Sequence, residues 1–177
     1  MDRTPARRPR KFGRRALLIG GAGVAAMAAA GTPVFVSGPA ARGRKWLSST
    51  ECAAALALAE TLFPKGSEAG MPSAEEADVL GRLDEAVGGM HPEIRRLFKL
   101  GLRAFEWAPI ASFFSRFSAL DAPRRAAVVR SWERGSYSRQ AILLSLRFQV
   151  GVAYFESDAA RKSCGWSIGC SPSTSEG

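Results

Sequence analysis

The longest helical pattern in the sequence runs from Ser136 or Ser138 to about Phe155 and is apolar on nearly every side. One apolar stripe recurs at helical spacing and consists of Ala141, Leu144, Phe148, Val152 and Phe155. A second apolar set covers much of the remaining circumference: Ile142, Leu143, Leu146, Val150 and Tyr154. A helix of this kind is buried, because its surface must be covered by other elements. We therefore expect a central helix around which the other helices pack.

Upstream of this pattern the chain carries helix start and stop signals. The capping-box form Ser-x-x-Glu occurs at 48–51 and at 73–76, and Asp121 is placed to cap a later helix. These signals, with Pro and Gly at the boundaries, predict helices over 48–63, 73–89, 92–108, 109–117 and 122–134. The buried face of the third of these is expected to be Ile94, Leu97, Phe98, Gly101, Leu102 and Phe105. Because no alternating stretch of convincing length occurs, we predict an all-α compact domain of about five to six helices.

The first forty residues have the pattern of an export signal. Seven basic residues precede an uncharged run from Ala16 to Ala41, and Ala28–Ala30 offers a cleavage site. An arginine pair followed by two leucines narrows the prediction to the twin-arginine type, and the residues are Arg14, Arg15, Leu17 and Leu18. A Sec signal and an uncleaved anchor extending to about residue 36 are the alternatives. The predicted organisation is a signal (1–30), a linker (31–45), a helical domain (46–157) and an irregular tail (158–177).

The twin-arginine route carries folded proteins, so either this chain binds a cofactor or it travels with a partner that does. His91 is the only histidine, and its place before Pro92 indicates a helix start at the surface. The acidic pairs Glu75–Glu76 and Asp84–Glu85 are expected at exposed helical positions. The sequence has no motif for a di-iron, haem, iron–sulfur, dinucleotide or serine-hydrolase site. We predict no catalytic residue, cofactor or metal in this chain.

The net charge of +9 does not indicate a nucleic-acid partner. Residues 1–30 hold seven of the 25 Lys and Arg and one of the 16 Asp and Glu, so the remaining chain has a net charge of +3. No basic cluster interleaved with aromatic residues follows the signal. Nucleic-acid binding is therefore not expected.

The cysteines and tryptophans bear on protein partners. Cys52 falls in the first turns of a helix, where we expect a small buried residue; a thiol that faces a partner is the alternative. Cys164 and Cys170 are near enough in sequence to form a disulfide; the alternative is one thiol bonded to a partner and the other free. Tryptophans often anchor interfaces, and three are candidates for docking on a partner: Trp107, Trp132 and Trp166. For Trp166, packing of the tail onto the helical core is the alternative.

Several short segments together resemble one known family. After the twin-arginine leader they are ETLFP (60–64), ADV (77–79), RLFKLGL (96–102), FSAL (117–120), RRA (124–126), YF (154–155) and the Gly-Trp pair of the tail. From about residue 45 to 170 the chain resembles the gluconate 2-dehydrogenase subunit 3 family, the small subunits of exported flavin-dependent sugar and alcohol dehydrogenases.

The resemblance implies a non-catalytic subunit that binds a large flavoprotein dehydrogenase, with FAD in that partner and none in this chain. A cytochrome subunit is a further partner that the resemblance allows. It also implies that both subunits cross the membrane together through the twin-arginine translocase, and that the complex works in the periplasm or at the outer face of the cytoplasmic membrane. The alternative is a free-standing exported or membrane-anchored helical protein with a binding or structural role.

Overall fold

The computed structural model describes residues 40–66 and 70–165, and in these ranges it contains helices and no strand. The elements are α2 (Ser49–Leu62), α3 (Val79–Gly89), α4 (Pro92–Trp107), α5 (Ile110–Phe113), the 3₁₀-helix η1 (Phe117–Ala119), α6 (Ala122–Glu133), α7 (Tyr137–Phe155) and α8 (Asp158–Ser163). The all-α prediction is confirmed. In the ranges described, the helices are too short or too polar for any of them to cross a membrane.

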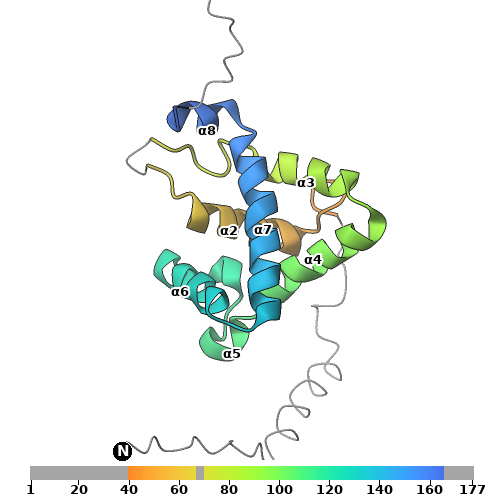
Figure 1. The fold of residues 1–177 in the computed structure, drawn as a ribbon, viewed down its shortest axis with the longest axis vertical. Helices are drawn as coiled ribbons and strands as arrows, with labels where there is room; N and C mark the ends of the chain where they lie inside the picture. Colours follow the sequence, from red (N-terminus) through yellow and green to blue (C-terminus); the bar gives the residue numbers. More distant parts are fainter. Residues whose placement is uncertain (1–39, 67–69, 166–177) are drawn as a thin grey trace, which may run out of the picture. The chain divides into compact units, whose positions relative to one another are not determined.

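Helix α7 is the central element, as predicted (Figure 1). Helices α2, α3, α4, α6 and α8 all pack against it. Its buried residues are Leu143, Leu146, Val150, Ala153 and Tyr154. The expected burial on nearly every side is wrong, because Leu144, Phe148 and Val152 lie on an exposed side of the helix. Both sides of this helix are apolar, and sequence periodicity alone cannot tell which of them the neighbouring helices will cover.

Helix α2 begins at the predicted capping box. The Ser48 amide donates to the Glu51 carboxylate at 2.8 Å, and the Glu51 amide donates to Ser48 Oγ at 3.4 Å. The Glu51 side chain is fully buried and also lies 3.3 Å from Lys99 Nζ and 3.4 Å from Arg103 Nε. Both cations belong to α4, so one carboxylate starts α2 and joins it to α4.

Asp84 is buried, which corrects the prediction of an exposed acidic position. Its carboxylate accepts hydrogen bonds from the backbone amides of Lys45 (2.9 Å), Trp46 (3.0 Å) and Leu47 (2.8 Å). Burial alone would raise the pKa of Asp84, but these three bonds outweigh it and hold the pKa below its usual range. Asp84 therefore fastens the segment that enters the domain, residues 45–47, onto α3.

The second capping box forms but does not start a helix directly. The Ser73 amide donates to Glu76 at 2.7 Å, and the Glu76 amide donates to Ser73 Oγ at 3.1 Å. The chain then turns at Asp78, which has left-handed backbone angles (φ 47°). α3 starts only at Val79, with Asp78 as its N-cap. The predicted helix over 73–89 is thus shortened at its start.

The carboxyl-terminal boundary also differs from the prediction. Helix α8 lies in the segment expected to be irregular, and the Ser157 side chain caps it by accepting a hydrogen bond from the Ala160 amide. Ala160 is fully buried. The packed domain therefore extends beyond residue 157.

Candidate partner-binding surface

The outer face of α7 exposes a row of large apolar side chains. Leu144, Phe148 and Val152 are 70%, 64% and 39% exposed. They are spaced four residues apart, so they lie one above another on the helix. Isolated exposed apolar residues are common on soluble proteins, whereas a continuous row is not. This row is the first part of a candidate binding surface.

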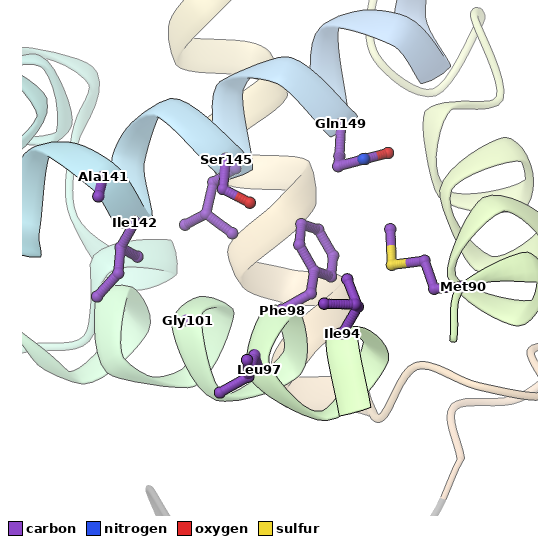
Figure 2. A pocket seen from close by; sticks show the side chains of 10 residues that line it. Met90, Ile94, Leu97, Phe98, Gly101, Ala141, Ile142, Ser145 and Gln149 are labelled. Carbon is purple, nitrogen blue, oxygen red and sulfur yellow. The ribbon is translucent and has the colours of Figure 1, made fainter. Parts of the chain in front are cut away.

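An apolar groove of about 340 Å³ lies between α4 and α7 (Figure 2). Its lining residues Ser145 and Gln149 are three positions before Phe148 and Val152, so the groove adjoins the row on α7. Its lining consists of Met90, Ile94, Leu97, Phe98, Gly101, Ala141, Ile142, Ser145, Leu146 and Gln149. Ile94 and Leu97 form its α4 rim and are 55% and 63% exposed. Both had been predicted in the core. Ser145 and Gln149 are the polar side chains of the lining, so the groove is suited to apolar groups with few hydrogen bonds.

Gly101 sets the floor of the groove. A Cβ atom at this position would lie 3.3 Å from Ile142 Cγ2 and 3.9 Å from Leu146 Cδ2. The first distance is shorter than ordinary van der Waals contact, so a larger residue would push α4 and α7 apart or displace Ile142. The glycine thus allows the two helices to approach closely beneath the rim residues Ile94 and Leu97.

Comparison with known protein families identifies the family of this chain. Residues 49–167 match the family model described as Gluconate 2-dehydrogenase subunit 3. The chain belongs to this family. The sequence-based resemblance is therefore confirmed, and the family name denotes a subunit of a dehydrogenase complex. The comparison with curated proteins and the comparison with solved structures each gave no match.

The tryptophans predicted to anchor a partner have different environments in the structure. Trp132 is only 5% exposed, and its ring meets Phe105 edge-on at 4.9 Å between centroids. It is a core residue and offers no docking surface. Trp107 is half-buried, and the Arg116 guanidinium lies 5.7 Å from its ring centroid. Trp166 lies outside the described residues.

The predicted leader residues Arg14, Arg15, Leu17 and Leu18 also lie outside the described residues, and so does Cys170. The exposed Cys164 has its thiol 3.8 Å from the sulfur of Met71, and its pairing with Cys170 stays a prediction.

Cys52 is buried as predicted, and this burial raises the pKa of its thiol. His91 is exposed at the start of α4, which agrees with the surface position expected for it.

Among the described residues, Glu106 is the buried acid that most resembles a catalytic group. It is fully buried, and burial raises its pKa, although hydrogen bonds from Ser118 oppose that effect. Both carboxylate oxygens are engaged: one accepts from the Ser118 amide at 3.0 Å and the other from the Ser118 hydroxyl. With both oxygens occupied and no exposed surface, Glu106 serves to hold η1 against α4. Among the described residues, no group of three or more His, Cys, Asp or Glu is arranged to hold a metal ion.

Sequence reasoning missed the candidate surface because it assigned the apolar residues of α4 and α7 to the core. One signal was available. The apolar residues of α7 cover more of its circumference than a few short helices can bury, and the excess has to face either solvent or another protein.

Proposed function

We propose that this chain is a non-catalytic accessory subunit of an exported FAD-dependent sugar or alcohol dehydrogenase of the gluconate 2-dehydrogenase type. The observation that carries the proposal is the family match over residues 49–167. It is supported by the exposed apolar surface on α4 and α7, which fits a chain that works in a complex.

In this proposal the partner subunit holds FAD and performs the oxidation, and the accessory chain binds and stabilises it. Stabilisation follows from mass action, because a partner that binds only the folded catalytic subunit shifts its unfolding equilibrium towards the folded state. The pattern at Arg14 and Arg15 supplies the twin-arginine signal for both chains, so the pair is exported in the folded state. The complex then acts in the periplasm or at the outer face of the cytoplasmic membrane.

The test is purification of the tagged full-length chain from its native host. We expect a larger flavoprotein to co-purify, recognised by flavin absorption in the visible and by dye reduction with gluconate or a related sugar acid or alcohol. A colourless chain without dehydrogenase activity would refute the proposal and favour a free-standing helical binding protein.

Export is tested with the double variant Arg14→Lys/Arg15→Lys. We expect both chains and the dehydrogenase activity to remain in the cytoplasm, because the arginine pair is the part of the leader that defines this route. Unchanged export of the activity would refute the twin-arginine assignment while leaving the subunit assignment intact.

A further inference from the structure

We propose that the catalytic subunit docks on one defined surface of this chain, the α4/α7 face. This face comprises the exposed residues Ile94 and Leu97 of α4, Leu144, Phe148 and Val152 of α7, and the groove between the two helices. The inference rests on the proposed function, and it specifies where the partner binds.

The size of the face matches what one partner requires. The five side chains are between 39% and 70% exposed. If a free leucine, isoleucine or phenylalanine side chain presents on the order of 150 Å², together they offer roughly 400 Å² of apolar surface. A stable interface buries about 800 Å² on each partner, of which a little over half is apolar. The α4/α7 face therefore supplies the apolar part of one standard interface, and one partner would occupy it fully.

Two of the charges near the face are satisfied within the chain, those of Arg147 and Arg95. Between residues 140 and 155 the only charged residue is Arg147, whose guanidinium lies 2.6 Å from the Glu133 carboxylate of α6. On α4, Arg95 donates to the carbonyls of Gly88 and Met90 at 2.9 and 3.0 Å, and its guanidinium lies 4.0 Å from the Trp46 ring centroid. The centre of a protein interface is typically depleted of charge, because a charge buried without a partner is costly. The α7 part of the face has that composition, whereas the exposed Glu93 and Arg96 next to Ile94 and Leu97 place charges at its α4 rim.

A second apolar site lies around α5 and is the other candidate docking site on the described residues. Phe114 is 93% exposed, while Ile110 and Phe113 are each 37% exposed. Only one of these side chains is largely accessible, so this site offers less apolar surface than the α4/α7 face. It provides a matched control, because Phe114 allows the same phenylalanine-to-glutamate change at an exposed position on another element.

A second copy of this chain is the other protein that such a face could bind. The family name denotes one component of an enzyme complex. Since the face offers apolar area for a single partner, the catalytic subunit and a second copy would compete for it. Because the family name denotes a subunit of a dehydrogenase complex, we assign the face to the catalytic subunit.

The experiment compares the tagged full-length wild type, the double variant Leu144→Glu/Phe148→Glu and the control Phe114→Glu, all expressed in the native host. Each chain is purified, and the flavin-to-chain ratio, the gluconate-dependent dye reduction and the far-ultraviolet circular dichroism are measured. Sedimentation gives the number of copies in each complex. Both targeted residues are mostly exposed, so helical content is expected to be unchanged.

We expect the double variant to lose flavoprotein and the control to retain it. Burying a charge at an interface hot spot weakens binding by about thirtyfold or more per residue. Retention of the flavoprotein by the double variant would overturn the inference, and so would its loss in Phe114→Glu alone. Loss of a homodimer with the flavoprotein still bound would assign the face to a second copy and equally overturn it. If the wild type itself carries no flavoprotein, the proposed accessory function is refuted. If only the double variant lacks the effect expected of it, the function stands and the docking surface alone is refuted.

If the double variant proves misfolded by circular dichroism, a milder test uses Leu144→Ser/Phe148→Ser. Serine removes the apolar contact without burying a charge. We expect at least a tenfold fall in the flavin-to-chain ratio at limiting concentration, since each side chain contributes apolar area to the contact. A ratio equal to the wild type would overturn the inference.

Discussion

Replacing Asp84 tests how the domain holds the chain that enters it. In Asp84→Ala the amides of Lys45, Trp46 and Leu47 lose their acceptor. Leu47 is fully buried, so its amide cannot turn to water, and leaving such a donor unsatisfied costs about 1–3 kcal/mol. The bonds of the other two amides are only partly buried, so water recovers part of them. We expect Asp84→Ala to lower the free energy of unfolding by about 3 kcal/mol.

Asp84→Asn is the matched, smaller change. The amide oxygen can replace Oδ1, which accepts from Trp46 and Leu47, but the amide nitrogen faces the Lys45 donor in place of Oδ2. Loss of the charge and of one bond should cost about 1.5 kcal/mol. Urea unfolding followed by circular dichroism measures both variants, and with a slope of about 2 kcal/mol per molar the midpoint of the alanine variant should fall by about 1.5 M.

The pH dependence of the free energy of unfolding gives an independent check on the role of Asp84. The pKa of Asp84 is lower in the folded state than in the unfolded chain, so its contribution is complete above the unfolded pKa, near 3.9. That contribution is lost as the pH falls through the folded pKa. The stability difference between wild type and Asp84→Asn should therefore shrink below about pH 4. An alanine variant within about 0.5 kcal/mol of wild type, or a difference that does not change with pH, would refute the reasoning.

Two further substitutions test other parts of the structure by the same urea measurement. Glu51→Gln removes the fully buried negative charge next to Lys99 and Arg103 and should cost about 3 kcal/mol, because a buried arginine and a largely buried lysine lose their counter-charge. A cost below about 1 kcal/mol would mean that these charges contribute little to joining α2 and α4. Phe114→Asn should stabilise the domain by about 0.5–1 kcal/mol, because asparagine tolerates the left-handed backbone at this exposed position (φ 51°) better than phenylalanine. A destabilised Phe114→Asn would contradict the assignment of strain to this residue.

The features predicted correctly from the sequence depend on neighbours within one helical turn. The Ser48 capping box joins residues only three apart, and the proline at the start of α4 acts on its own backbone. Asp84 could not be assigned in this way, because its three partners lie 37 to 39 residues away in the sequence. Nothing local distinguishes it from an exposed helical acid.

The candidate surface was missed for a related reason. The apolar residues of α7 were identified correctly, but the choice of face depends on where α2, α3, α4 and α6 pack. The same holds for Ile94 and Leu97, which repeat at helical spacing with true core residues such as Phe98. Periodicity locates an apolar stripe but does not say whether this chain or another one covers it.

The entry segment also has a mechanical consequence. Any pull from the amino-terminal side of the chain reaches the domain at Ala40, which pairs with Ser48, and at Ala41, whose amide donates to the Leu47 carbonyl at 2.9 Å. This loop and the Asp84 bonds would carry the load before any core helix does. Opening residues 40–46 would release about 20 Å of extended chain while the buried Leu47, the Ser48 capping box and the packed helices stay in place. We therefore expect this segment to detach first under tension, before any of the packed helices unfolds.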